Sequence, residues 1–376
     1  MNKLIKVIAV IMACLFMFTA CKTTVNNDKK DETAPTETTT DKTEETSTDK
    51  TEETSTDKTE ETSTDAESED EAWKKEPTYG KAIKIGYNGG LCTGGPGLAS
   101  ALGMFKDEGI ETEIVNVQSK VDAIGTGKVD LTCDHIATML VPAVNGVDME
   151  FKAAAQTGCK SLYVLDNGEI NSTADLKGKA IGLPDGIGNS DHNIALRFLN
   201  HDDIAPQDVK FLPVEGSASI LALENGEIQA VVLSDQFAEK FVNDGKIKMI
   251  RSLTYDDDFK LEPCCVYAFN KTFAKENPIT AKKITKVLFR VSDYIQNNIE
   301  EATQTLFDNN WASGDFDQAV RMMKSYNWQV TNEMTSTALK NILDDYKEFG
   351  VITSNKSSDE LLSEVWHEED FKHEIK

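Results

Sequence analysis

The sequence has no excess of positive charge. Of its 376 residues, 39 are Lys or Arg and 64 are Asp or Glu, which gives a formal net charge of −25. A chain this acidic repels phosphate backbones and anionic lipid headgroups. The composition therefore argues against nucleic acid and against a bare anionic membrane surface as natural partners.

The sequence also lacks the short motifs of several large enzyme classes. It contains no G-x-S-x-G elbow, no H-E-x-x-H helix and no G-x-x-x-x-G-K-[ST] phosphate loop. No C-x-x-C or H-x-x-x-H spacing indicates a metal site. We therefore expect no catalytic residues and no cofactor.

The N-terminal apolar run from Val7 to Phe18 is too short to span a bilayer. Lys3 and Lys6 precede it, an arrangement typical of a secretory signal. The run continues into F-T-A-C, which resembles the lipobox of bacterial lipoproteins and implies that Cys21 is lipidated. We expect a signal peptide over 1–20 and a protein anchored by lipid on the outer face of the cell membrane. An ordinary signal peptide with an incidental cysteine is the alternative.

Residues 21–77 have little apolar content and consist mainly of Thr, Glu, Asp, Lys and Ser. The octapeptide D-K-T-E-E-T-S-T occurs three times in succession, beginning at Asp41, Asp49 and Asp57. Such a segment cannot bury enough apolar surface to offset the conformational entropy lost on folding. We expect a disordered tether that holds a folded body away from the lipid anchor.

The rest of the chain alternates strand and helix patterns. K-A-I-K-I-G-Y reads as a strand, a glycine loop follows it, and Leu98, Leu102 and Phe105 then share one helical face. A second such unit starts at A-I-G-L-P and continues to C-C-V-Y-A-F-N, after which only helical patterns occur. Strands alternating with helices over short loops favour an α/β fold built on parallel sheets with helices on both sides.

Several segments resemble, in order, the type II periplasmic binding proteins of the nitrate, sulfonate, taurine and thiamine-precursor branch. The segments are I-K-I-G-Y, A-L-G-M-F-K-D-E-G-I-E-T-E-I-V, G-T-G-K-V-D-L, S-T-A-D-L-K-G-K-A-I-G-L-P and L-E-N-G-E-I-Q-A-V-V-L-S-D-Q-F-A-E-K. The resemblance implies two Rossmann-like lobes joined by two crossing strands, with C-terminal helices. It places the first lobe at 78–167 and 268–376, the second at 168–267, and the hinge near Leu165 and Val266.

The resemblance also implies a function. Proteins of this family capture a small solute between their lobes for an ABC importer, so a permease and its ATPase would be the partners of a monomeric chain. A sulfonate, a nitrate-like anion or a pyrimidine-type organic solute would suit this branch. Two alternatives stay open: a surface lipoprotein that senses a ligand without its own permease, and a cysteine-dependent enzyme that uses Cys92 and His135.

Ligands of open α/β sheets lie beyond the carboxyl ends of the strands, so residues at those ends are the candidate contacts. In chain order they are Cys92, Thr93, Asp134, His135, Thr138, Cys159, Gly188, Asn189, Ser190, Asp235, Gln236 and Cys265. The helix that starts near Ser190 directs free backbone N–H groups toward the cleft, and Ser190 or Asp191 is expected to cap it. Cys264 and Cys265 are adjacent in a strand, so only one of them is expected to face the cleft.

Five cysteines remain once Cys14 and Cys21 are set aside, and all five lie at predicted strand ends or at the hinge. Three interpretations are open. In the first, the thiols line the pocket as neutral groups. In the second, a disulfide joins Cys92 to Cys133, or Cys159 to one of Cys264 and Cys265. In the third, Cys92, His135, Cys159 and Cys265 hold a soft metal ion.

Overall fold

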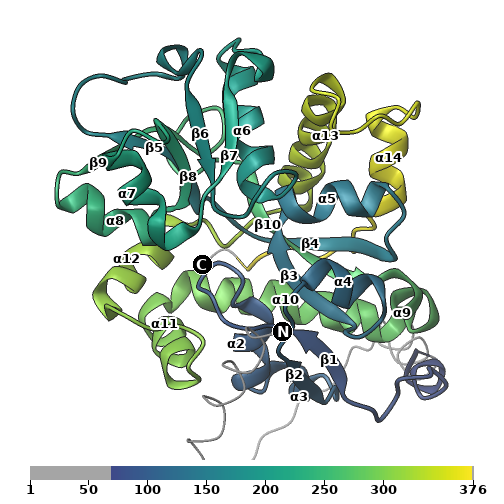
Figure 1. Ribbon diagram of the computed structural model, residues 1–376. Helices are drawn as coiled ribbons and strands as arrows, with labels where there is room; N and C mark the ends of the chain where they lie inside the picture. Colours follow the sequence, from purple (N-terminus) through teal and green to yellow (C-terminus); the bar gives the residue numbers. More distant parts are fainter. Residues whose placement is uncertain (1–68, 375–376) are drawn as a thin grey trace, which may run out of the picture. The chain divides into compact units, whose positions relative to one another are not determined.

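The computed structural model describes residues 69–374 (Figure 1). The predicted signal peptide, the lipidation site Cys21 and the tether repeats lie outside the described residues. Of the helices within 69–374, none combines the length and the hydropathy that a bilayer crossing requires.

Two five-stranded sheets organise the chain. The first has the order β2-β1-β3-β10-β4 and the second the order β7-β6-β8-β5-β9. The strands of the first sheet are β1 (Ile83–Gly86), β2 (Thr112–Val115), β3 (Leu131–His135), β4 (Met149–Thr157) and β10 (Pro263–Asn270). Those of the second are β5 (Lys160–Leu165), β6 (Ala180–Leu183), β7 (Lys210–Pro213), β8 (Ala230–Ser234) and β9 (Ile247–Ser252).

Each sheet is mixed rather than parallel throughout, which corrects the expectation of parallel sheets. In the first, β1 pairs in parallel with β2 and β3, whereas β10 is antiparallel to β3 and β4. In the second, β6 pairs in parallel with β7 and β8, whereas β5 is antiparallel to β8 and β9. The antiparallel strands, β5 and β10, are the ones that directly follow the two crossings. A chain that enters a lobe from its neighbour runs away from the cleft, against the strands that point toward it.

The sheets also show where the chain crosses between lobes. The first crossing is the pair Gly158 and Cys159, between β4 of the first sheet and β5 of the second. The second lies in 253–262, between β9 and β10. Both crossings therefore precede the expected boundaries at 167/168 and 267/268, since β5 already pairs in the second sheet and β10 already pairs in the first.

Helices cover both sheets (Figure 1). Those of the first lobe are α2 (Gly95–Ala101), α3 (Met104–Asp107), α4 (Lys120–Gly125), α5 (Ile136–Val144), α9 (Lys271–Glu276), α10 (Pro278–Asn297), α11 (Ile299–Asp308), α12 (Phe316–Ser325), α13 (Asn332–Glu348) and α14 (Ser358–Val365). Those of the second are α6 (Ser190–His201), α7 (Ser219–Glu224) and α8 (Asp235–Asn243), with the 3-10 turns η1 (Thr173–Leu176), η2 (Pro206–Asp208) and η3 (Gly216–Ala218).

The folded body starts earlier than the expected tether boundary after residue 77. Residues 69–73 are helical, and the buried Trp73 donates its indole N–H to Thr280 Oγ1 at 2.9 Å. The Glu76 carboxylate accepts the backbone N–H groups of Ile279 (2.5 Å) and Thr280 (2.9 Å), and so caps α10. One tryptophan and one glutamate thus anchor the end of a segment that composition alone assigns to the tether.

The C-terminal segment packs on the first lobe. In α14, Leu361 and Val365 are buried, and Trp366 forms a bridge to Phe151 of β4. The next residue, His367, donates its backbone N–H to the Phe151 carbonyl at 2.9 Å. Figure 1 shows α13 and α14 beside α5, and the three helices are in contact with one another or with β4.

We predict that Leu361→Ala lowers the free energy of unfolding by about 2–5 kcal/mol, because it leaves a cavity where a fully buried side chain packed. Leu221→Ala is the matched control, since Leu221 is 57% exposed and Leu361 is 1% exposed. Urea denaturation of both variants measures the difference. Equal losses in the two variants would show that α14 does not pack as described.

Candidate functional site

A cavity of about 800 Å³ lies between the two sheets. The first lobe lines it with the end of β3, with Thr138 and Pro142 of α5 and with the start of α4, and the second lobe with the loop after β6, the end of β8 and the start of α8. Of the predicted contacts, the cavity is lined by Asp134, His135, Thr138, Gly188 and Asn189. The structure therefore brings these five together from segments more than fifty residues apart in the sequence.

The other predicted contacts do not line this cavity. Ser190 and Asp235 are buried, Gln236 faces α12, and Thr93 is buried near Gly89. Cys92, Cys159 and Cys265 lie behind the cavity in the interior of the protein. Sequence position at a strand end thus did not separate residues that face the cleft from residues one layer deeper.

Lys160 is the main cavity residue that sequence reasoning missed. It follows the first crossing directly, and its Nζ lies 2.6 Å from Asp185 Oδ2, 2.5 Å from Asp191 Oδ1 and 2.9 Å from Ser190 Oγ. The only signal in the sequence was its position directly after Gly158 and Cys159, between two strand-like segments.

Burial and charge act in opposite directions on this group. Burial lowers the pKa of Lys160, but Asp191 and Asp185 raise it above its usual value, so the ammonium stays charged. Burial also raises the pKa of Asp185, but Lys160 outweighs it and lowers that pKa to about 2. The pKa of Asp191 is raised, mainly because its carboxylate is almost fully buried.

These contacts correct the expected capping of α6. Asn189 is the N-cap, and its side-chain oxygen accepts the Ser190 N–H at 2.9 Å. The Ser190 hydroxyl donates instead to Asp185, and the Asp191 carboxylate accepts the Asp185 N–H at 2.7 Å as well as the Lys160 bond. Both side chains are occupied by a long-range partner that the local sequence does not reveal.

The two lobes touch on both sides of the cavity. On one side Thr138 Oγ1 donates to Asn189 Oδ1 at 3.2 Å, and Asn193 Nδ2 donates to the Ala137 carbonyl at 2.8 Å. On the other side, Gln318 and Arg321 of α12 bond to Gln236 and Glu239 of α8, at 2.8 and 3.0 Å. The lobes are therefore in contact on either side of the cavity.

A buried ion cluster fastens α6 to the first lobe. The Arg197 guanidinium, 4% exposed, bonds to Glu262 Oε2 at 2.7 Å and to Asp345 Oδ2 of α13 at 2.6 Å. His201 approaches the same Asp345 carboxylate at 3.5 Å and Asp258 at 3.3 Å. Because Glu262 precedes β10 in the second crossing, this cluster joins both lobes and the hinge.

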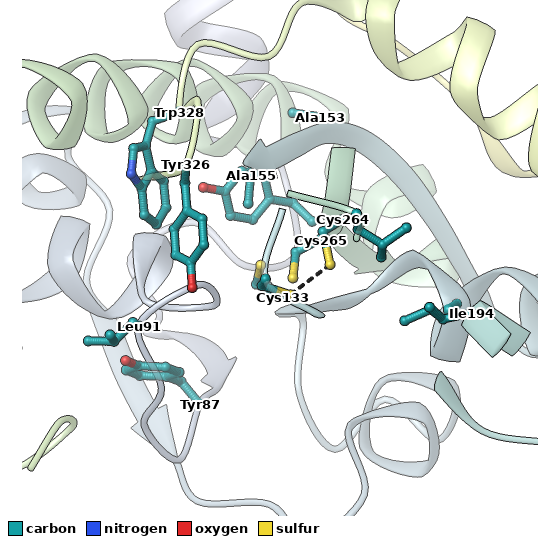
Figure 2. Packing of buried hydrophobic residues seen from close by; sticks show 14 of the residues in the cluster. Tyr87, Leu91, Cys133, Ala153, Ala155, Ile194, Cys264, Cys265, Tyr326 and Trp328 are labelled. Atoms are coloured by element: carbon teal, nitrogen blue, oxygen red, sulfur yellow. Dashed lines mark hydrogen bonds between the residues drawn. The ribbon is translucent and has the colours of Figure 1, made fainter. Parts of the chain in front are cut away.

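Behind the cavity, His135 faces a group of thiols. Its Nδ1 lies 3.3 Å from Cys264 Sγ, 3.5 Å from Cys265 Sγ and 3.6 Å from Cys159 Sγ. Cys159 Sγ and Cys264 Sγ are 2.8 Å apart. Figure 2 shows Cys133, Cys264 and Cys265 close together among the buried side chains. All five cysteines of the described residues are free, so the structure contains neither of the expected disulfides.

We expected one of Cys264 and Cys265 to face the cleft, but neither lines the cavity. Both sulfur atoms belong to one cluster with His135 and Cys159, all four ligand atoms lying within 4.8 Å of one another. The β4–β10 pairing shifts register between Pro263 and Cys265 and again before Val266. This irregularity interrupts the alternation of the strand and turns two successive side chains to the same side.

The thiols are not equivalent. Burial would raise the pKa of Cys265, but the surrounding thiols of Cys133, Cys159, Cys264 and Cys92 lower it well below its usual value. Burial would lower the pKa of His135, but Cys265 raises it to about 9. The Cys159 thiol lowers the pKa of Cys92, whereas Cys265 and burial raise it more strongly. The net pKa of Cys92 therefore lies well above its usual value. A protonated thiol outside the cavity gives the cysteine-enzyme alternative no support.

Two mixed sheets that the chain crosses twice, with a cavity between them, define the type II periplasmic binding protein fold. The alkanesulfonate-binding protein of Xanthomonas axonopodis pv. citri, solved with MOPS, is similar at a TM-score of 0.60 and 15% identity, covering 77% of this chain and 98% of that chain. The nitrate-binding protein of Synechocystis PCC 6803 gives a TM-score of 0.60 at 13% identity, covering 76% and 86%. The expected fold class is confirmed.

The family follows from the sequence. Residues 95–302, more than half of the chain, match the family described as NMT1/THI5 like, and the chain belongs to this family. A protein of Brucella abortus (strain 2308), named only as a binding protein, is 24% identical over 219 residues, which cover 54% of this chain and 64% of that relative. The chain thus covers slightly less than two thirds of the relative's length.

We predict that Lys160→Met lowers the free energy of unfolding by about 3–5 kcal/mol, because it leaves the buried Asp191 carboxylate without its counter-ion. Lys246→Met is the matched control, since the Lys246–Glu224 pair is exposed and worth at most about 1 kcal/mol. Chemical denaturation at neutral pH compares the two. A Lys160→Met protein as stable as the control would show that the Lys160–Asp191 ion pair does not form.

We predict that His201 makes the folded protein more stable in mild acid than above neutral pH. The Asp345 carboxylate raises the pKa of His201 above 6.5, while burial and Arg197 lower it; Asp258 also raises it. A raised pKa contributes stability that is fully present below pH 6.5 and is lost as the pH rises through the folded-state pKa. Denaturation from pH 5.5 to 9 should show a larger loss in the native chain than in His201→Gln, which keeps the contribution of His135.

His192→Gln is the control for the His201 prediction. Burial lowers the pKa of His192, so its removal alters the pH dependence only on the acid side of 6.5 and with the opposite sign. A His201→Gln variant with the native pH dependence above 6.5 would contradict the contact with Asp345.

Proposed function

We propose that the chain is the extracytoplasmic solute-binding component of an ABC importer. The observation that carries this proposal is the cavity of about 800 Å³ lined by both lobes, which are in contact on either side of it. A ligand that binds the closed arrangement better than an open one shifts the population toward closure, and a permease with its ATPase can recognise that shape. Membership of the NMT1/THI5-like family and the type II fold support this function.

The anchoring belongs to the same proposal and depends on the sequence. Cys21, after a short apolar run, carries lipid, and the acidic repeats give the folded body its reach from the membrane. The protein then acts as a monomer on the outer face of the cell membrane. A sensor without a permease would use the same cavity and the same anchor, and an adjacent permease gene distinguishes the two roles.

Charge in the cavity decides between the solute classes expected from the sequence. Four aspartates, Asp122, Asp134, Asp185 and Asp191, line the cavity with only two lysines. Both lysines already face carboxylates. Lys160 is paired with Asp191, and Lys120 lies 4.0 Å from Asp134. His135 is a third basic lining group, and its Nδ1 faces the thiols of Cys264 and Cys265, so a sulfonate or a nitrate-like anion would find no uncommitted cationic side chain among the lining residues. The lining therefore favours a solute that brings hydrogen-bond donors or positive charge.

An aromatic side chain favours a planar solute. Phe237 lines the cavity from α8 and is 38% exposed, so its ring is accessible to a bound solute. The face of such a ring stacks on a heteroaromatic ring and attracts a cation. Among the classes expected from the sequence, the pyrimidine-type organic solute with amino substituents fits these features best.

A thermal-shift screen followed by calorimetry tests the proposal. We expect an aminopyrimidine to stabilise the protein, by about 2.7 kcal/mol at a concentration 100 times Kd, and taurine, MOPS and nitrate to stabilise it less. Phe237→Ala should weaken aminopyrimidine binding about 3- to 10-fold through lost stacking. Tyr255→Ala is the matched control, because Tyr255 is 50% exposed and does not line the cavity.

Two results would contradict this assignment. Tight sulfonate binding with no response to aminopyrimidines would refute the solute class. Solute binding that Phe237→Ala leaves unchanged would show that the cavity is not the binding site.

A further inference from the structure

We propose that His135, Cys159, Cys264 and Cys265 form a binding site for one thiophilic metal ion, Zn(II) or Cu(I). The four ligand atoms lie within 4.8 Å of one another and come from three separate segments of the chain. His135 ends β3, Cys159 forms the first crossing, and the cysteine pair begins β10. The site goes beyond solute capture and does not depend on it.

The nitrogen–sulfur distances match a tetrahedral ion. Metal–sulfur bonds of about 2.3 Å and metal–nitrogen bonds of about 2.0 Å separate nitrogen and sulfur by roughly 3.5 Å in a tetrahedron. His135 Nδ1 lies 3.3, 3.5 and 3.6 Å from the three sulfur atoms. The 2.8 Å between Cys159 and Cys264 is shorter than a tetrahedral edge, so these two sulfur atoms move apart by about 1 Å when the ion enters.

The donor set and its burial determine the class of metal. Thiolates with one imidazole select Zn and Cu(I) over Mg and Ca, which prefer oxygen ligands. Cys159, Cys264 and Cys265 are 2%, 6% and 0% exposed, so the ion is enclosed by four protein ligands. Four protein ligands in a closed sphere are typical of a structural rather than a catalytic site.

Two backbone irregularities place these sulfur atoms. Cys159 has a φ of 111°, a conformation that residues with a side chain rarely adopt. Its N–H donates to Thr254 Oγ1 at 2.9 Å, Thr254 donates to Asp235 Oδ2 at 2.5 Å, and Asp235 N–H donates back to the Cys159 carbonyl at 2.9 Å. The second irregularity is the register shift that turns Cys264 and Cys265 the same way.

This hydrogen-bonded loop gives Asp235 a role other than the expected ligand contact. Asp235 also accepts a bond from Tyr163 at 2.7 Å, which fixes its carboxylate. Asp235 is thus a positioning residue for Cys159, in the way that outer partners orient the ligands of metal sites. An ion at this site links the first crossing to the end of β3 and the start of β10, and so stiffens the hinge.

The test is metal binding by the purified chain, reduced and handled without oxygen. Zn(II) or Cu(I), added alone to metal-free protein, should bind at one ion per chain, survive desalting and raise the melting temperature. Co(II), used as a spectroscopic substitute, should give thiolate charge-transfer absorption and the intense bands of a tetrahedral ion. Comparing Zn(II) with Cu(I) competition identifies the preferred metal.

Variants separate ligands from neighbours. Cys265→Ser and His135→Ala should each weaken metal binding at least about 100-fold, since even outer-partner changes cost 10- to 100-fold. Cys133→Ser and His192→Gln are matched controls that keep the ion, because neither residue belongs to the four-ligand group. Circular dichroism and the urea unfolding transition of each variant confirm that it is folded.

Three outcomes would overturn the proposal. One is that fully reduced, folded protein binds neither ion above the level of Cys265→Ser. Another is that the ion binds equally well when His135 and Cys265 are replaced. The third is a stable Cys159–Cys264 disulfide in protein isolated from cells, with no metal uptake after reduction. None of these results bears on solute binding, so they leave the proposed importer function separately testable.

Discussion

The structure depends on one constraint: the chain must cross between its two sheets twice, and both crossings pass through the same small region. Cys159 in the first crossing donates its N–H to Thr254 in the second, and Asp235 accepts a bond from Thr254 and donates one to the Cys159 carbonyl. This contact makes the two connections act as one joint. The cavity opens on one side of the joint, through His135 and Lys160, and the thiols fill the other side.

Buried charge gives the cavity its character. Lys160 enters it from the first crossing and is neutralised by Asp185 and Asp191 before any solute arrives. A buried ammonium cannot remain without counter-ions, so the loop after β6 folds back to supply them. Ser190 and Asp191, at the start of α6, bond to Lys160 in this way. Fold alone, shared with anion-binding relatives, therefore does not determine which solute the cavity accepts.

Sequence alone predicted the fold class and the family, because strand and helix periodicity and the order of the motifs survive without tertiary information. It misplaced the crossings, since only Gly158 and Cys159 separate the consecutive strands β4 and β5. It also missed Lys160, whose carboxylate partners lie 25 and 31 residues away. The paired orientation of Cys264 and Cys265 depends on a strand irregularity that alternation rules exclude.

Closure about this joint is the central claim, and small-angle X-ray scattering tests it most directly. The chain should be measured without solute and with a saturating concentration of the aminopyrimidine that stabilises it most. The account predicts a smaller radius of gyration with solute, and no change in a variant whose cavity cannot bind it. An identical scattering curve in the two conditions, at proven saturation, would contradict a hinged receptor.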